Sequence, residues 1–149
     1  MKGEPVQNAQ IEIWQANKFG KYAHPSDPNK TPLDENFQGF AVIKSNAQGH
    51  FRFKTIKPGA YPISPTEQRT PHIHFDVKGK HNRLATQMFF PDEPLNEKDI
   101  LFQELRSRFK ITKPRFSSAD MLIAKSLPAT KEIEAGAMLL SWDVVLVNG

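Results

Sequence analysis

The stretch that most constrains the fold lies near the middle of the chain and reads Arg69-Thr70-Pro71-His72-Ile73-His74-Phe75-Asp76-Val77. Side chains of a β-strand point to opposite faces at successive residues, so this stretch has one apolar and one polar face. Ile73, Phe75 and Val77 form the apolar face, which has the character of a face packed on a core. His72 and His74 lie on the polar face, where both imidazoles point to the same region. We therefore expect a strand that buries one face and presents a pair of histidines on the other.

A His-x-His pair on one strand face can supply two ligands to a metal ion. The same pair also occurs as hydrogen-bonded core histidines or on a solvated strand face, and the spacing alone leaves these readings open. The chain has only two tyrosines, Tyr22 and Tyr61, and both stand in turn or loop sequence rather than on a strand face. A tyrosine in such a place can also pack on the surface with its hydroxyl in water. Because the chain has no cysteine and few carboxylates near the histidines, a metal ion there would need other oxygen ligands.

Short strands separated by turn residues account for most of the remaining pattern. Apolar alternation predicts further strands at 10–15, 37–44, 50–55, 85–90 and 139–147. The last of these is apolar on both sides, which is typical of a central strand. Residues 17–36 form a long loop that contains Tyr22, and loops of this length are usually functional. One helix is predicted at 97–109, with Asn96 as its N-cap. The pattern favours an all-β fold, a β-sandwich of mixed topology with one short helix and long loops.

The composition is that of a globular protein with one core. The chain has 149 residues, of which 38% are hydrophobic and 24% charged, which fits a single domain. The net charge of +4 is spread without a long basic run, which argues against a nucleic-acid-binding protein. No stretch has the length of a membrane-spanning helix, and no apolar signal region follows Met1. We therefore expect a cytoplasmic protein with neither nucleic acid nor membrane as a partner.

Six motifs, in order, resemble those of the intradiol ring-cleavage dioxygenases. They are Ile11-Glu12-Ile13-Trp14-Gln15-Ala16-Asn17, Gly20-Lys21-Tyr22-Ala23-His24, Pro32-Leu33-Asp34-Glu35-Asn36-Phe37-Gln38-Gly39-Phe40, Thr55-Ile56-Lys57-Pro58-Gly59-Ala60-Tyr61-Pro62, Arg69-Thr70-Pro71-His72-Ile73-His74-Phe75 and Thr86-Gln87-Met88-Phe89-Phe90-Pro91. The resemblance runs from about residue 3 to 95 and resumes at Trp142-Asp143-Val144-Val145-Leu146. Within the family, the pattern is most similar to the iron-bearing, beta-type subunit of the protocatechuate 3,4-dioxygenases.

The resemblance implies a non-haem Fe(III) centre with two tyrosine and two histidine ligands, which correspond to Tyr22, Tyr61, His72 and His74. It also implies that Tyr61 is the ligand that leaves when the substrate binds. Arg69 matches an arginine that stabilises negative charge on the substrate ring, and Gln87 matches an active-site glutamine. The donor types suit the metal, since a bound trivalent cation holds a tyrosine as tyrosinate. Two tyrosinates and one hydroxide balance its three positive charges.

Two other residues of these motifs have supporting roles in this interpretation. His24 follows the Tyr22 ligand closely, so we expect it to order the loop or support that ligand rather than bind the metal. Trp14 is expected to lie in the core.

The implied activity is the opening of a catechol ring between its two hydroxyl-bearing carbons, with incorporation of molecular oxygen, to a cis,cis-muconate-type product. Residues 1–149 would form a single catalytic domain, acting on protocatechuate (3,4-dihydroxybenzoate) as a homo-oligomer or as a hetero-oligomer with a related subunit. Ile63 and Ser64 stand where the family has Trp-Arg, which leaves hydroxyquinol or a larger catechol open as the substrate. The alternative from a different class is a non-catalytic, prealbumin-like β-sandwich binding module.

Overall fold

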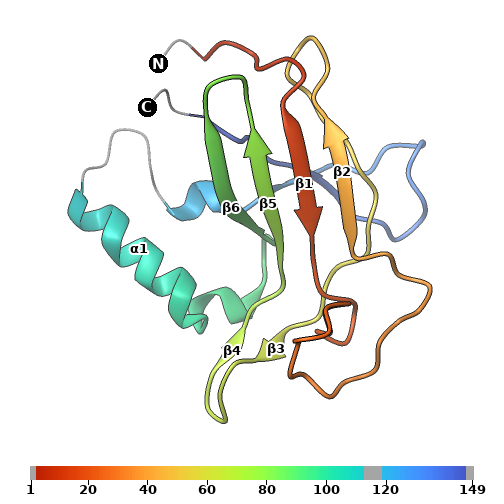
Figure 1. The fold of residues 1–149 in the computed structure, drawn as a ribbon, viewed down its shortest axis with the longest axis vertical. Coiled ribbons are helices and arrows are strands. Elements are labelled where there is room, and N and C mark those ends of the chain that lie inside the picture. Colours follow the sequence, from red (N-terminus) through yellow and green to blue (C-terminus); the bar gives the residue numbers. More distant parts are fainter. Residues whose placement is uncertain (1–2, 113–118, 147–149) are drawn as a thin grey trace.

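A four-stranded antiparallel sheet forms the centre of the computed structural model, which describes residues 3–112 and 119–146 (Figure 1). Its strands, in the order β2-β1-β5-β6, are β1 (Gln10–Trp14), β2 (Phe40–Lys44), β5 (His72–Lys78) and β6 (Arg83–Phe89). The histidine-bearing strand β5 lies inside the sheet and pairs with β1 and β6. The expected strand pattern is confirmed for these four elements, and every strand pair in the described part of the chain is antiparallel.

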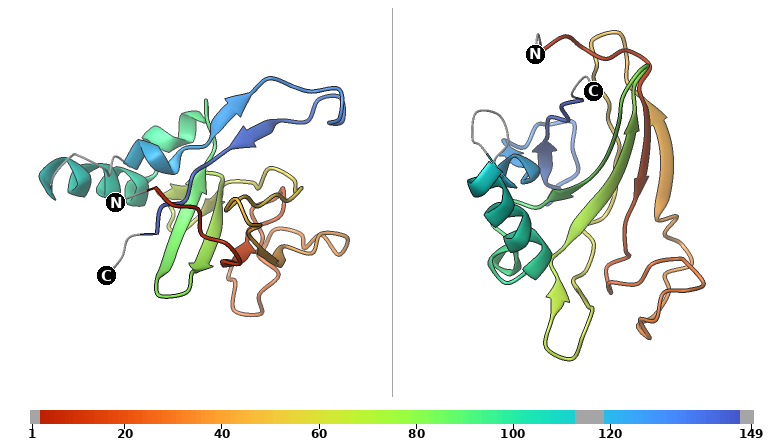
Figure 2. Two further views of the ribbon diagram at one scale, coloured as in Figure 1. Left: turned by 90° about the horizontal axis from the view of Figure 1, so that it is seen from above. Right: turned by 60° about the vertical axis from the view of Figure 1, so that its left-hand side comes forward.

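Smaller elements surround this sheet. They are the hairpin β3 (Tyr61–Pro62) and β4 (Gln68–Arg69), the pair β7 (Lys125–Leu127) and β8 (Leu139–Ser141), the helix α1 (Ile100–Thr112), and the 3₁₀ helices η1 (Pro94–Glu97) and η2 (Ala119–Leu122). Figure 2 shows α1 and the C-terminal segment on the same side of the sheet. The all-β class with one short helix and long loops is therefore confirmed. No helix in residues 3–112 and 119–146 is long and apolar enough to cross a membrane.

The apolar face of β5 is the centre of the core, as its alternation predicts. Ile73, Phe75 and Val77 are all buried in one hydrophobic cluster. Rings from two distant parts of the chain pack on Phe75: the centroid of Phe53 lies 5.9 Å away and that of Trp142 4.9 Å away. The polar face of β5 is consequently turned away from the core, which leaves its histidines free to face the loops at one end of the sheet.

Two predicted strands are absent or shortened because alternation does not specify a backbone partner. Residues 50–55 form no strand, although Phe51 and Phe53 do pack against the core as predicted. In place of a central strand at 139–147, only Leu139–Ser141 is a strand, and its one ladder is with β7. Residues 142–146 follow without a ladder, and residue 147 lies outside the described residues.

The start of the helix also differs from the prediction. Asn96 belongs to η1, and α1 begins at Ile100. Asp99 is the N-cap, since its Oδ1 accepts a hydrogen bond of 2.9 Å from the Phe102 N–H. Asn96 instead uses its side chain to bond the Phe90 carbonyl and the Thr70 hydroxyl. Asn96, four positions before the first residue of the helix, resembled a cap because it too is a polar residue that precedes the apolar pattern.

Candidate metal centre

Four side-chain donors converge at one end of the sheet. His72 and His74 come from β5, Tyr61 from β3, and Tyr22 from the loop between β1 and β2. The two Nε2 atoms lie 3.1 Å apart, His74 Nε2 lies 3.1 Å from Tyr22 Oη, and His72 Nε2 lies 3.4 Å from Tyr61 Oη. The structure therefore brings all four predicted ligand residues together, across 52 residues of sequence between Tyr22 and His74.

Burial keeps the two histidines and Tyr22 uncharged in the protein without metal. It lowers the pKa of His72 to about 3, with Arg69 and His74 as further causes. It lowers the pKa of His74 to about 4, and Arg69 adds to that shift. Burial also raises the pKa of Tyr22, and the neighbouring Tyr61 raises it further. A metal ion binds the neutral form of an imidazole. A bound cation would lower the pKa of Tyr22, which is the opposite of the effect of burial.

The donor set fits a metal ion by its lone pairs and its spacing. A carbonyl oxygen can only accept, so the Thr70 carbonyl, 2.6 Å from His72 Nδ1, requires the proton on Nδ1. His72 Nε2 then carries a lone pair directed at His74 and Tyr61. Neighbouring ligands that each lie about 2.1 Å from one ion, at right angles, are about 3 Å apart. The described residues contain no group of three or more His, Cys, Asp or Glu that could hold a metal ion, so any ion here needs the tyrosine oxygens.

Asn17 orders the two segments that carry the tyrosines. It is buried, and its Oδ1 accepts hydrogen bonds from the Phe19 and Lys21 N–H groups, at 2.8 and 3.0 Å. Its carbonyl accepts from the Gly20 and Gly59 N–H groups, at 3.1 and 2.9 Å. One residue shortly after β1 thus joins the Tyr22 loop to the turn before Tyr61.

The backbone of these two segments approaches so closely that glycine is required at the contact. Gly20 has a φ of +77°, and a Cβ there would lie 2.3 Å from the Ala60 carbonyl oxygen and 2.9 Å from Tyr61 Cβ. Gly59 is confined in the same way, since a Cβ would lie 2.4 Å from the Lys18 carbonyl oxygen. The close approach sets how far apart the two tyrosines can be.

We expect Gly20→Ala to lower the free energy of unfolding by about 2–4 kcal/mol, measured by urea denaturation. The loss combines the cost of positive φ with the overlap at Ala60 and Tyr61. Gly136→Ala is a matched control, because Gly136 also has positive φ, +81°, but nothing lies within 4 Å of its added Cβ. It should cost only the conformational strain, about 1–2 kcal/mol. Equal losses in the two variants would contradict the constraint at Gly20.

Arg69 and Gln87 meet beside the four donors. Arg69 lies on β4 rather than on the histidine strand β5, because Thr70 and Pro71 belong to neither strand and separate the two. Its Nη2 donates to Gln87 Oε1 at 2.6 Å, and Gln87 is paired with His74 in the sheet register. The arginine is buried, with 5% of its surface exposed. The two residues predicted beside the metal therefore contact each other.

The prediction for Trp14 is wrong, whereas the contacts of His24 agree with the predicted loop-ordering role. Trp14 pairs with His74 in the sheet register, and the two rings stack with centroids 4.9 Å apart and planes 3° apart. Trp14 therefore lies on the histidine face, opposite the core residues Ile11 and Ile13, as strand parity requires. His24 is exposed, and its hydrogen bonds among the described residues stay within the loop: its Nδ1 bonds Ser26, and its carbonyl accepts from the Asp27 N–H at 3.0 Å.

Three residues that hold the site were not singled out from the sequence. Asp27 accepts a 2.7 Å hydrogen bond from the Tyr22 N–H, Asn17 organises both tyrosine segments, and Asp99 bonds Arg69. Asp99 carried a usable signal, since an aspartate immediately before an apolar helical run is a typical N-cap. Asp27 and Asn17 lie in loop sequence, where periodicity carries no information.

The chain is similar to known proteins over nearly all its length. A family model described as "Dioxygenase" matches residues 1–148. The protocatechuate 3,4-dioxygenase beta chain of Burkholderia cepacia is 41% identical over 149 residues, which cover 97% of this chain and 59% of that one. The catechol 1,2-dioxygenase of Acinetobacter baylyi is 33% identical over 114 residues, which cover 67% of this chain and 36% of that one. The chain thus spans little more than half the length of one relative and about a third of the other.

A solved structure shows the same fold. Catechol 1,2-dioxygenase from an Acinetobacter species, inhibited by bound mercury, matches 98% of this chain and 48% of its own with a TM-score of 0.67. The identity in that comparison is 23%, so the likeness concerns the fold alone.

Proposed function

The chain belongs to the intradiol ring-cleavage dioxygenase family, and on that basis we propose that residues 1–149 form one catalytic domain that opens a catechol-type ring between its two hydroxyl-bearing carbons. Both atoms of molecular oxygen enter the product, which is a cis,cis-muconate-type dicarboxylic acid. The observation that supports this best is the convergence of two imidazoles and two phenols, with a buried arginine and a glutamine beside them.

Tyr22, Tyr61, His72 and His74 would hold a non-haem Fe(III) ion. Bound there, the ion supplies Lewis acidity that favours the doubly deprotonated form of a catechol and makes its ring electron-rich. The chain supplies neutral imidazoles, since burial keeps both histidine pKa values low. It also supplies two phenols, each of which a bound cation would hold as an anion.

The chain's residues account for the protons and for the charge that develops on the ring. A catechol must lose two protons to bind as a dianion. We assign one of them to Tyr61 Oη and the other to the hydroxide that would balance the third charge of the ion. Tyr22 keeps its place because its backbone N–H is tied to Asp27, in a loop whose lysine, Lys21, also donates to the carbonyls of Asp27 and Asn29. Arg69 provides fixed positive charge where negative charge develops, which is electrostatic stabilisation by a preorganised group.

Protocatechuate is the substrate we propose, because the relative with 41% identity is a protocatechuate 3,4-dioxygenase beta chain. Hydroxyquinol or a larger catechol is the second candidate. Ile63 and Ser64 replace the family's Trp-Arg in the hairpin next to Tyr61, and Ile63 is 47% exposed. We further propose a related subunit or a second copy of this chain as partner.

Colour and oxygen uptake test the proposal. The iron-loaded protein should be burgundy through tyrosinate-to-iron charge transfer, and it should consume one molecule of oxygen per protocatechuate. With ¹⁸O-labelled oxygen, both labels should appear in the ring-opened product. A colourless, iron-replete sample would favour the non-catalytic module, and turnover of catechol or hydroxyquinol without protocatechuate would overturn the substrate assignment alone.

A further inference from the structure

Two side chains hold the Arg69 guanidinium through two of its nitrogens. Its Nε donates to Asp99 Oδ2 at 2.9 Å, and its Nη2 donates to Gln87 Oε1 at 2.6 Å. Within the part of the chain that the structure describes, Nη1 makes no hydrogen bond, yet no buried side-chain nitrogen or oxygen lacks a partner. Nη1 is therefore accessible, and its two N–H groups remain for a ligand.

Asp99 is fully buried, and each of its contacts holds a different part of the site. Its exposed fraction is 0%. Besides Arg69, its Oδ2 accepts a 2.8 Å hydrogen bond from the Thr70 N–H, while Oδ1 caps α1 through the Phe102 N–H at 2.9 Å. A buried carboxylate is stable only when paired and hydrogen-bonded, and these three donors satisfy that condition.

Thr70 links Asp99 to His72 through two hydrogen bonds of its backbone. The Thr70 N–H bonds Asp99, and the Thr70 carbonyl accepts from His72 Nδ1. The Thr70 hydroxyl also bonds Asn96, at 2.9 Å. Residues 96–99 thus hold both the arginine and the backbone that orients His72.

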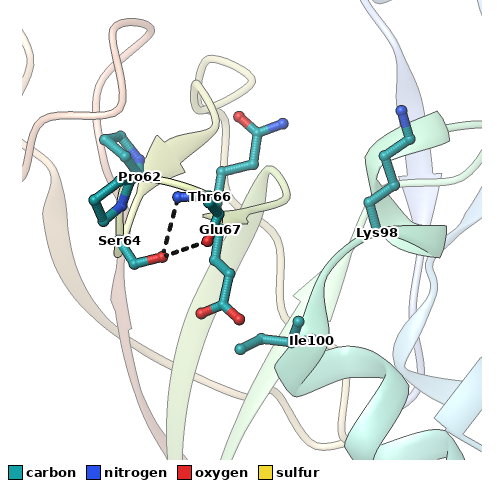
Figure 3. A pocket seen from close by; sticks show the side chains of 8 residues that line it. Pro62, Ser64, Thr66, Glu67, Lys98 and Ile100 are labelled. Carbon is teal, nitrogen blue, oxygen red and sulfur yellow. Dashed lines mark hydrogen bonds between the residues drawn. The ribbon is translucent and has the colours of Figure 1, made fainter.

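Away from Asp99, the hairpin that carries Arg69 and the start of α1 are separated by a pocket. A pocket of about 300 Å³ separates the β3–β4 hairpin from the start of α1 (Figure 3). Lys98 and Ile100, the residues on either side of Asp99, line it, and Ile100 points toward Glu67 of the hairpin. Since the outer surfaces of hairpin and helix are separated by this pocket, the buried contacts of Asp99 join them.

We infer that Asp99 is a positioning residue, which aims the guanidinium of Arg69 at the substrate and steadies His72 through Thr70. This inference rests on the proposed function. The alternative is a purely structural role, in which Asp99 only caps α1. The alternatives differ in the atoms involved, because the cap uses Oδ1 and the contacts to Arg69 and Thr70 use Oδ2.

Asp99→Asn separates the two roles. Asparagine caps helices as well as aspartate does, so Oδ1 can still accept from Phe102. Its Nδ2 would then face the Arg69 and Thr70 N–H groups, donor against donor, which displaces the guanidinium. We expect kcat for protocatechuate to fall about 30-fold, with KM changed less than about threefold. Asp99→Ser keeps a capping oxygen without the opposed donors, and it should show the same split between kcat and KM.

A double-mutant cycle and a spectrum without metal distinguish positioning from general loosening. If Asp99 acts through Arg69, Asp99→Asn should lower kcat less than about threefold in the Arg69→Gln background. In NMR spectra of the metal-free protein, the Arg69 Nε–H resonance, identified by its absence in Arg69→Gln, should exchange slowly in the wild type and be lost in Asp99→Asn. Glu93→Gln is the matched control, because Glu93 also caps a helix, η1, and pairs with a basic side chain, Lys57. It should keep both the resonance and kcat.

Retention of the Arg69 Nε–H resonance and of the wild-type kcat in Asp99→Asn and Asp99→Ser would overturn the inference. The inference would also be overturned if the fold losses of kcat from Asp99→Asn and Arg69→Gln multiplied fully in the double variant. If the wild-type protein turned over no catechol, the proposed function would fail instead, and the NMR comparison would still decide whether Asp99 positions Arg69.

Discussion

Replacing Tyr22 by phenylalanine is expected to remove most of the visible absorption of the iron-loaded protein, or the iron itself. Its Oη lies 3.1 Å from His74 Nε2, and a phenyl ring offers no oxygen in that place. The remaining three donors would leave one positive charge unbalanced in a buried site. We expect kcat to fall by about 10³-fold or more, since a bound metal ion contributes several kcal/mol to the barrier. Absorption spectra, iron analysis and oxygen uptake measure the three effects.

Because the chain has only two tyrosines, variants at both positions can assign the visible band to individual residues. Tyr61→Phe should keep a tyrosinate band from Tyr22, and the double variant should have none, because no other tyrosine is present. A tyrosinate band in an iron-loaded double variant would show that the metal lies elsewhere. Full colour and full rate in Tyr22→Phe would contradict its assignment as a ligand.

Arg69→Gln is expected to lower kcat by about 10²–10³-fold while the colour of the iron-loaded protein remains. The arginine contacts Gln87 and Asp99 but none of the four donor atoms through a hydrogen bond, so iron binding should survive. The variant also leaves the buried Asp99 without its ionic partner, which should cost about 3–5 kcal/mol of stability. Arg69→Lys keeps the charge but cannot bond Asp99 and Gln87 at the same time through separate nitrogens. Its kcat should therefore lie between those of the wild type and Arg69→Gln.

Arg83→Gln is the matched control for this loss. Arg83 also pairs with an aspartate, Asp76, at 2.6 Å, but its side chain is 67% exposed. It lies on β6 opposite Lys78, at the end of β5 that is far from His72. It should change kcat little and stability by no more than about 1 kcal/mol. Equal losses of rate in the two variants would argue against a specific role for Arg69.

The strands and the faces of the central sheet were predictable because their signal is local. Alternation within a few residues identified β1, β2, β5 and β6, and it assigned Ile73, Phe75 and Val77 to the core. The failures concern pairing. Residues 50–55 alternate as a strand does but have no ladder, and those from 142 to 146 run on without one. Alternation reports which side chains face the core and is silent on which backbone lies alongside.

The same distinction explains the single residues that were misassigned. Trp14 was expected in the core because large aromatic side chains are usually buried there, yet its parity in β1 puts it beside His74. Asn96 resembled a cap, but the residue that caps α1, Asp99, is also the partner of Arg69, which is 30 positions earlier. A contact of that sequence separation cannot be read from local pattern.

The sequence by itself determined the chemical character of the site: a histidine pair on one strand face, two tyrosines in turns, and no thiolate to compete with them. These follow from residue types and from the two-residue period of a strand. Only the tertiary structure decided that the four donors meet, each within 3.1–3.4 Å of a neighbouring donor. It also decided that Gly20 lets the tyrosine segments touch and that Asp99 holds the arginine. Convergence of distant segments depends on how the whole chain packs, because hydrogen bonds and close backbone contacts form between elements that the local sequence cannot relate.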